Sequence, residues 1–250
     1  MRKCILILFL LLATSSLAQE DYYLVNSPLA ALPAHGDYQF TARILDGGTV
    51  LARTEIGIQD RFSLGLSWGM LGLLGTGKVR TYSETGLMLR YRLVEEIELP
   101  SMLVGFDNQG QGNWSDEYQR YDRKSKGFFF VMTRHWFGPF GTDFSTSGGL
   151  NYSLEGNDES GFDLFAGLEW VLEPRFSLIL DWSAGLNDRY LDERFGEGNG
   201  WLDLALAWKI ADRIQFKVLV CDLFENSLDP VTGETPGAER QLLVSFGSHF

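Results

Sequence analysis

Hydrophobic and polar positions alternate along most of the chain after Asp37, and the last segment shows the pattern plainly. Within Arg240–Phe250, one set of alternate positions holds Phe250, Ser248, Phe246, Val244 and Leu242. The positions between them are mostly small or polar. Successive side chains of a β-strand point to opposite faces, so a period of two predicts a strand with one apolar face.

The same period recurs in about twelve segments. They are predicted over residues 38–44, 50–58, 62–68, 87–93, 102–106, 128–132, 150–154, 162–170, 176–182, 202–208, 214–220 and 240–250. The apolar sets carry Leu, Phe and Trp, whereas the opposite sets carry Gly, Ser, Asp and Arg. In residues 128–132 the two faces are poorly separated.

The connections between these segments alternate in length. Asp60-Arg61, Pro174-Arg175 and Asp212-Arg213 lie in three-residue turns, whereas most of the other connections are long, polar and rich in glycine. Bacterial outer-membrane barrels have an even strand number, short periplasmic turns and longer extracellular loops. The sequence therefore predicts an all-β fold, an antiparallel transmembrane β-barrel of about 12 strands over residues 37–250. The short first connection, Asp46-Gly47-Gly48, is the exception to the alternation.

A soluble β-sandwich or a lipocalin-like barrel would also alternate, with the apolar face packed inside. Strand number, loop asymmetry and the terminal Phe250 favour the membrane barrel. No segment after residue 18 reaches the roughly 18 consecutive apolar residues that a transmembrane helix needs. The aromatic content of 14% and the 28 glycines also suit a barrel.

The N-terminus has the features of a secretory signal peptide. Arg2 and Lys3 precede the apolar run Cys4–Leu12, and Ser16-Leu17-Ala18 is a small-x-small cleavage site. We therefore predict a signal peptide over residues 1–18, export, and residence in the cell outer membrane. Residues 19–36 contain Pro28 and Pro33 and show no strand period. They are predicted to form either a periplasmic lead-in or a short plug in the lumen.

Charge and cysteine content narrow the function. Cleavage removes two of the 21 basic residues and none of the 33 acidic ones, so the net charge changes from −12 to −14. An acidic, exported chain is a poor candidate for nucleic-acid binding. Cys221 is the single cysteine left after cleavage, so no internal disulfide is expected.

The polar faces of the predicted strands carry the candidate lumen charges. These are Arg43, Arg53, Glu55, Arg90, Arg92, Asp107, Asp163, Glu169, Asp181, Asp203, Lys209 and Lys217. The early strands are rich in Arg and the later ones in acid. One interpretation is a salt-bridged interior that replaces a hydrophobic core. The other is a constriction with a transverse field that selects small charged solutes.

Catalytic signals are weak. The three histidines, His35, His135 and His249, show no metal-ligand spacing and no pairing with a nearby serine that would form a catalytic site, so we predict no enzyme activity, cofactor or metal. The long loop Asn108–Lys126 combines Trp114, Tyr118 and Tyr121 with several carboxylates. Its side chains are interpreted either as a sugar-contacting surface or as an ordinary solvated loop.

The closing strand carries the predicted assembly signal. Its residues are Leu242, Val244, Phe246 and Phe250, and the partners they imply are outer-membrane lipid and the barrel-assembly machinery. An open sheet edge cannot lie in lipid, so this strand is expected to pair with the first one, near residues 37–45.

Several short motifs resemble those of YjbH-like outer-membrane proteins, which are linked to exopolysaccharide production. They are Leu103-Val104-Gly105-Phe106-Asp107-Asn108-Gln109-Gly110, Lys126-Gly127-Phe128-Phe129, Asn26-Ser27-Pro28 with Leu32-Pro33, and Gly149-Leu150-Asn151-Tyr152-Ser153-Leu154. The resemblance spans roughly residues 26–188, although this chain has the strands of one barrel where larger relatives have more, and it lacks a lipobox. It implies a polysaccharide partner and no catalytic residues. Three functions follow as expectations: support of exopolysaccharide export or assembly, a narrow passive channel for small solutes, and a structural barrel with a plugged lumen.

Overall fold

The computed structural model describes residues 21–76, 78–82, 84–138, 142–156, 161–188, 195–229 and 232–250. The predicted signal peptide lies outside the described residues. Within the described part of the chain, no helix is long and apolar enough to cross a membrane.

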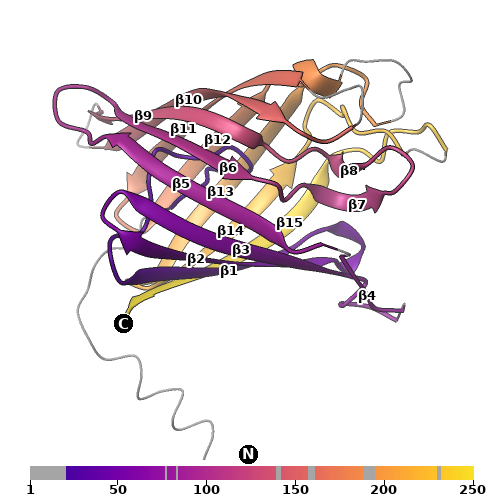
Figure 1. Ribbon diagram of the computed structural model, residues 1–250, viewed down its shortest axis with the longest axis horizontal. Helices are drawn as coiled ribbons and strands as arrows, with labels where there is room; N and C mark the ends of the chain where they lie inside the picture. Colours follow the sequence, from indigo (N-terminus) through magenta and orange to yellow (C-terminus); the bar gives the residue numbers. More distant parts are fainter. Residues whose placement is uncertain are drawn as a thin grey trace, which may run out of the picture.

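Twelve strands form the wall of the molecule (Figure 1). They are β1 (Asp37–Ile44), β2 (Val50–Gln59), β3 (Phe62–Leu71), β5 (Gly86–Val94), β6 (Ser101–Asp107), β9 (Gly127–Phe137), β10 (Asp143–Ser153), β11 (Gly161–Glu173), β12 (Phe176–Ser183), β13 (Trp201–Ala211), β14 (Ile214–Cys221) and β15 (Glu239–His249). Each predicted segment corresponds to one of these strands. Among the described residues, one-turn 3-10 helices lie in the connections at η1 (Asp46–Gly48) and η4 (Leu186–Asp188).

The sheet closes on itself. Its order is β2-β1-β15-β14-β13-β12-β11-β10-β9-β6-β5-β3, and the pairing of β3 with β2 completes the ring. The last strand pairs antiparallel with the first, from Asp37 opposite His249 to Ile44 opposite Leu242. The prediction of a closed antiparallel 12-stranded barrel is confirmed. Closure leaves no wall strand with an unpaired edge.

Short and long connections lie at opposite ends of the barrel. At the short-turn end, the backbone carbonyls of Arg61, Arg175 and Arg213 each accept an N–H from the strand that follows in the ring, at 2.9–3.0 Å. At the long-loop end, short β4 (Arg80–Thr81) pairs antiparallel with the end of β3, and β7 (Gln111–Ser115) pairs with β8 (Arg120–Arg123) as a hairpin. The tight turns therefore continue the hydrogen bonding between neighbouring strands up to the short-turn end of the barrel.

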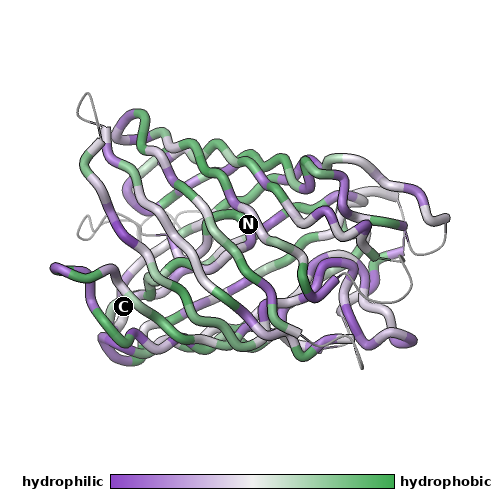
Figure 2. The backbone as a smooth tube through the Cα atoms, turned by 90° about the horizontal axis from the view of Figure 1, so that it is seen from above, coloured by the Kyte–Doolittle hydropathy of each residue, from purple (hydrophilic) through white to green (hydrophobic). Residues whose placement is uncertain are grey.

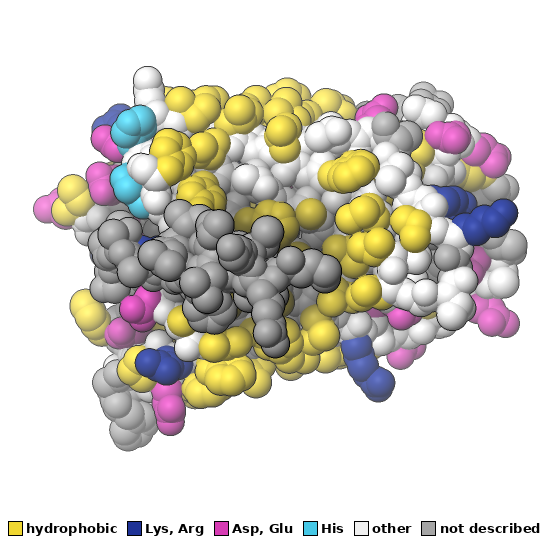
Figure 3. Space-filling view, turned by 90° about the horizontal axis from the view of Figure 1, so that it is seen from below, with side chains coloured by type: hydrophobic (Ala, Val, Ile, Leu, Met, Phe, Trp, Pro, Cys, Tyr) yellow, Lys and Arg dark blue, Asp and Glu magenta, His cyan; other side chains and the backbone are white. Residues whose placement is uncertain are grey.

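Hydrophobic and hydrophilic residues both occur along each strand of the wall (Figure 2), and their alternation gives the wall two different surfaces. Large apolar side chains such as Leu66, Trp68, Leu164 and Trp208 are exposed on the outside, whereas Ser63, Ser67, Asp181 and Gln215 are buried on the inside. In a space-filling view, hydrophobic side chains gather over the middle of the wall and charged ones near its two ends (Figure 3). An apolar girth between polar ends fits a lipid bilayer.

Candidate functional site

Residues 21–36 run inside the barrel, entering from the short-turn end (Figure 1). Residues 22–29 form a small hairpin, in which the Leu24 N–H donates to Ser27 O and the Leu29 N–H donates to Tyr22 O, both at 3.0 Å. Tyr23 and Pro28 lie opposite each other in it. We name residues 21–33 the plug and Val25–Ser27 its tip.

The tip is bound by one wall carboxylate. Asp181 Oδ2 accepts the backbone N–H groups of Val25, Asn26 and Ser27 at 3.1, 2.7 and 2.8 Å. Asp203, directly across from Asp181 on β13, accepts the Asn26 side-chain amide at 2.6 Å. Both carboxylates are 0% exposed. Like charges directly opposite in a sheet destabilise it, so the donors of the tip supply hydrogen bonds that these two carboxylates need.

Basic side chains bind the carbonyl groups of the plug. Arg43 donates to Asn26 Oδ1 at 2.7 Å and to Val25 O at 3.3 Å, while its Nε donates to Gln241 at 2.7 Å. Lys217 donates to Leu24 O at 2.9 Å and pairs with Asp21 at 3.1 Å. These contacts come from β1 and β14, on the side of the wall where the barrel closes.

Tyr23 lies between two guanidinium groups. Arg53 and Arg90 stand 4.8 and 4.4 Å from the ring centroid, and the hydroxyl donates to Asp107 at 2.6 Å. Arg90 pairs with Glu55 at 3.0 Å and donates to Leu29 O at 3.1 Å. Cation–π contacts gain strength when the groups are removed from water, as they are here.

The part of the plug that follows the hairpin, around Ala30, lies along β6 and β9. The Ala30 N–H donates to Thr133 Oγ1 at 2.9 Å, and Ser101 donates to Ala30 O at 2.8 Å.

Two wall glycines allow the N-terminal segment to lie close to the inner face of the wall. A Cβ on Gly57 would lie 1.9 Å from Ala34 O, and one on Gly167 would lie 2.2 Å from Leu24 Cδ1. Glycine at both positions is required by the chain that runs past them.

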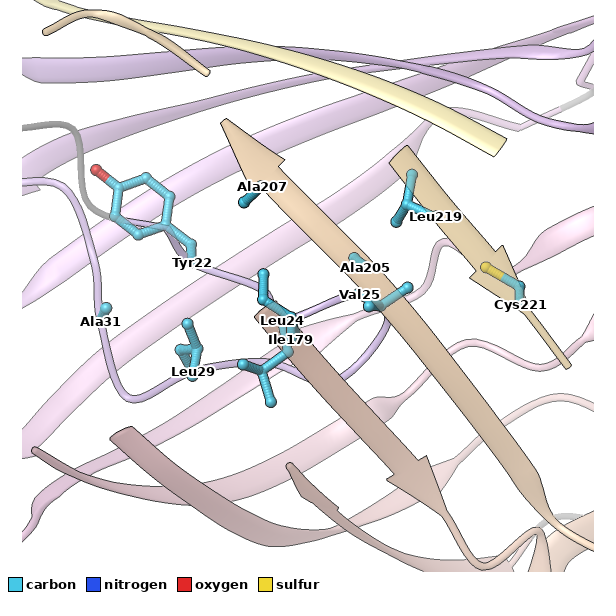
Figure 4. Packing of buried hydrophobic residues seen from close by; sticks show 10 residues of the cluster. All are labelled: Tyr22, Leu24, Val25, Leu29, Ala31, Ile179, Ala205, Ala207, Leu219 and Cys221. Atoms are coloured by element: carbon cyan, nitrogen blue, oxygen red, sulfur yellow. The ribbon is translucent and has the colours of Figure 1, made fainter. Parts of the chain in front are cut away.

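Apolar plug residues pack against apolar residues on the inner wall (Figure 4). Leu24, Val25 and Leu29 form a buried cluster with Ile179 and Leu219. A second cluster is formed by Ala30, Leu32, Leu103, Phe129, Val131 and Phe165. Sequence reasoning missed these wall residues as part of the site. The signal was present, because large apolar residues at lumen positions, most visibly around Phe129 and Val131, require a partner inside the barrel.

Cavities lie on both sides of the plug. A cavity of about 680 Å³ at the short-turn end is bounded by Leu29–Ala31, Arg92, Glu95, Glu96 and Glu169. A cavity of about 300 Å³ at the long-loop end is bounded by Asp46, Asp122, Arg123, Asp222 and Gln241. We name these the inner and outer vestibules.

The structure places the twelve predicted lumen charges on the inner face of the wall, with unequal contacts. Seven of them contact the plug directly, namely Arg43, Arg53, Arg90, Asp107, Asp181, Asp203 and Lys217, whereas Glu55 acts through Arg90. Asp163 instead accepts from the Ser183 hydroxyl and the Leu186 N–H. Arg92 and Glu169 border the inner vestibule, and Lys209 is half-buried near the short-turn end of β13. Two ion pairs join predicted lumen charges, Arg53 with Asp107 at 3.6 Å and Arg90 with Glu55 at 3.0 Å.

The predicted assembly residues lie on the outer face of β15. Leu242, Val244 and Phe250 are exposed, while Phe246 contacts Tyr38 of β1 at a ring-centroid distance of 6.4 Å. Phe250 stacks on Tyr38 at 6.2 Å, and its N–H donates to Gly36 O at 3.2 Å. The terminal aromatic therefore lies at the seam where the barrel closes and the plug enters.

The aromatic side chains of the long loop that carries β7 and β8 pack against one another and against neighbouring loops, and a sugar-contacting surface on this loop stays a prediction. Tyr121 is 5% exposed and packs against Tyr82 and Trp114, while Tyr118 packs against Phe195. Glu155 accepts the N–H groups of Tyr121 and Ser125, both at 3.0 Å. The aromatic residues thus fix the hairpin over the outer vestibule.

The histidines occupy the short-turn rim. His35 contacts Ile58 O at 2.7 Å, His135 contacts Glu96 at 2.6 Å, and His249 contacts Asp37 at 2.8 Å. Partial burial would raise the pKa of Glu96, but the hydrogen bonds from His135 and the nearby positive charge of Arg134 lower it overall. Among the described residues, no group of three or more His, Cys, Asp or Glu side chains is arranged to hold a metal ion.

Comparisons with known proteins bear on the fold. No family model matches the sequence, and no curated protein matches it. The KdgM porin in complex with disordered oligogalacturonate aligns with a TM-score of 0.51 and 10% identity, over 85% of this chain and 99% of that one. Another structure of the KdgM porin aligns with a TM-score of 0.48 and 9% identity, and the NanC porin with 0.46 and 10%, each over 85% of this chain and 99% of the other. The fold is that of an outer-membrane porin-type β-barrel.

Proposed function

We propose that the protein is a non-enzymatic channel of the outer membrane for small polar solutes, held closed in this conformation by its N-terminal plug. One observation carries the proposal: the closed barrel has a vestibule with charged side chains at each mouth, and a short segment attached at one end separates the two vestibules. A barrel that served as a scaffold alone would have no need of charged vestibules at both mouths.

The contacts of the plug suit a removable part. Most of the donors and acceptors around it belong to charged wall residues, such as Asp181, Arg43 and Lys217, which water can solvate when the plug leaves. A hydrogen bond to a charged group that is exchanged for water changes the free energy by about 1.5–3 kcal/mol. The apolar contacts of Leu24 and Leu29 with the wall favour the closed state.

The fold comparison supports a channel more than an export role. The porins that align with this chain are channels by name, and one was solved with oligogalacturonate. A role in exopolysaccharide export, implied by the YjbH resemblance, stays a prediction. Outer-membrane residence and assembly by the barrel-assembly machinery are part of the proposal, with the short-turn end in the periplasm.

Solute flux into liposomes tests the proposal. We expect a variant lacking residues 21–33 to admit small sugars and oligogalacturonate, and the mature full-length protein to admit them much more slowly. Heat-modifiable migration on gels serves as the control that the shortened barrel is folded. If a folded barrel without the plug admits none of these solutes, the protein is no channel.

A further inference from the structure

The inner wall accepts hydrogen bonds from the backbone of the plug. The three consecutive N–H groups of the tip donate to Asp181 at 2.7–3.1 Å, and the N–H of Ala30 donates to Thr133 at 2.9 Å. Both acceptors are buried, Asp181 on β12 and Thr133 on β9. Two strands that are not neighbours in the ring thus bind the backbone donors of one segment.

The inner wall also donates hydrogen bonds to the carbonyl groups of the plug. Among the described residues, side chains from β1, β5, β6 and β14 make these contacts, at 2.8–3.4 Å. They are Arg43 to Val25 O, Arg90 to Leu29 O and Ala31 O, Ser101 to Ala30 O, and Lys217 to Tyr23 O and Leu24 O. Wall donors and wall acceptors together therefore match the two kinds of polar group in a polypeptide backbone.

These backbone contacts do not depend on which side chains the plug carries. The Ser27 hydroxyl is buried and has no hydrogen-bond partner among the described residues, although the N–H of the same residue is bound. Ala30 has no polar side chain, yet both its N–H and its carbonyl are bound. Polar side-chain contacts to the wall are made by Asp21, Tyr23 and Asn26. A different peptide could therefore make most of the backbone contacts.

Aliphatic side chains of the inner wall lie between its polar groups. Ile179 and Leu219 pack against Leu24, Val25 and Leu29 of the plug (Figure 4). A peptide presents N–H and carbonyl groups together with side chains, so a wall that combines polar and aliphatic groups fits it. A sugar ring has hydroxyl groups around its edge, and hydroxyl groups placed against Ile179 and Leu219 would lose water without gaining a partner.

We propose that the inner wall is a binding site for short peptides, and that peptides of small and aliphatic residues are the solutes this channel takes. The inference rests on the proposed channel function and names the class of its substrate. The plug occupies the site as an internal peptide, so an entering peptide competes with it for the same donors and acceptors. Main-chain hydrogen bonds supply affinity in this mode of recognition, and side-chain pockets supply specificity.

Competition with the plug tests the site in the mature full-length protein. Ala30 is buried, so the thiol introduced by Ala30→Cys, in a Cys221→Ser background, reacts with a maleimide in proportion to the displaced plug. At about ten times its dissociation constant, trialanine should raise the labelling rate about 10-fold, because it binds the wall that the plug has left. Trisarcosine, an isomer with the same charged ends and no amide N–H, should leave the rate unchanged, and so should the sugar raffinose.

A matched pair of variants assigns the effect to the wall carboxylate. Asp181→Ala removes the acceptor of three N–H groups, so trialanine and trisarcosine should then change the labelling rate of that variant equally. Asp163→Ala, which removes a buried carboxylate bound to Ser183 and Leu186, should keep the difference between the two peptides. Equal effects of the two peptides on the protein with Asp181 intact, or no effect of trialanine, would overturn the proposal.

Flux into liposomes separates this inference from the channel proposal. If raffinose and trialanine both enter but trialanine does not change the labelling rate, the channel stands and the peptide site fails. If trialanine raises the labelling rate but no solute enters, the wall binds peptides and the protein is no channel.

Discussion

Asp181 is the residue on which the position of the plug most depends. Its single Oδ2 atom accepts three consecutive backbone N–H groups, and it faces Asp203 across the sheet. This geometry resembles a turn of backbone amides around an anion, with the anion supplied by the wall. Hydrogen bonds to a charged group contribute about 1.5–3 kcal/mol each, so the cluster matters more than a single contact.

Replacing Asp181 with Ala should therefore loosen the plug without opening the barrel. Losing about 3 kcal/mol of plug binding would raise the displaced population about 100-fold, since 1.4 kcal/mol is a factor of ten. The measurement is protease cleavage within residues 21–33 in reconstituted protein. Asp163→Ala, which removes a buried wall carboxylate without touching the plug, should leave cleavage at the wild-type rate.

The pair of Arg90 with Glu55 supports a second prediction at the residue scale. Both side chains are buried and stand 3.0 Å apart. Arg90→Met leaves the buried Glu55 carboxylate without its ionic partner. This should lower the free energy of unfolding by about 3–5 kcal/mol in urea titrations of the protein in vesicles. Adding Glu55→Gln should recover part of this loss. Strictly additive effects of the two substitutions would show that the pair is not coupled.

At the scale of elements, the wall strands were predictable, whereas residues 19–36 allowed two predictions, a periplasmic lead-in and a short plug in the lumen. The period of two identifies every wall strand, because lipid and lumen impose opposite demands on successive side chains. The plug has no period, and its contacts are made by hydrogen bonds between its backbone and distant strands, as between Asn26 and Asp203. The lumen charges could be assigned to the inner face, but their partners could not, since pairing depends on three-dimensional register.

The hairpin of β7 and β8 was read as a loop for a related reason. Its strands are short, and its stability comes from packing of Tyr121 with Tyr82 and from Glu155 beneath it rather than from alternation. Such contacts join the hairpin to residues far along the chain. These long-range contacts cannot be predicted from the sequence of the hairpin itself.

The hairpin should respond to pH through Glu155. Burial raises the pKa of Glu155, although the hydrogen bonds from Ser125 and Tyr121 oppose the shift. A raised pKa means that its contribution to stability is complete below the ordinary value of about 4.3 and is lost as the pH rises through the raised value. Protease resistance of residues 108–126 should therefore fall as pH rises above that range. Glu155→Gln, which mimics the protonated side chain, should flatten this dependence, and an unchanged profile would refute the assignment.

The closing strand carries a prediction about assembly. Phe250 is 73% exposed, yet it stacks on Tyr38 at the seam between β15 and β1. Phe250→Asp should reduce the amount of barrel in outer-membrane fractions several-fold while leaving the conductance of the molecules that do assemble unchanged. Normal outer-membrane levels of this variant would contradict a role in assembly.

At the scale of the whole molecule, the closed sheet and the filled lumen meet at one place. The pairing of β1 with β15 closes the wall, and the plug closes the lumen from the same point, where Gly36 adjoins Phe250. The plug therefore lies next to the seam between the first and last strands of the barrel. The account makes the plug, rather than the wall, the part that decides whether solutes pass.

Single-channel recording with a reversible lock tests this claim most directly. Ala30 and Thr133 are hydrogen-bonded neighbours, so an Ala30→Cys, Thr133→Cys pair in a Cys221→Ser background should form a disulfide that holds the plug to β9. The account predicts brief openings in reductant, none after oxidation, and a steadily open pore when residues 21–33 are deleted. Identical records from the oxidised and reduced protein, or a folded plug-deleted barrel that conducts no current, would contradict it.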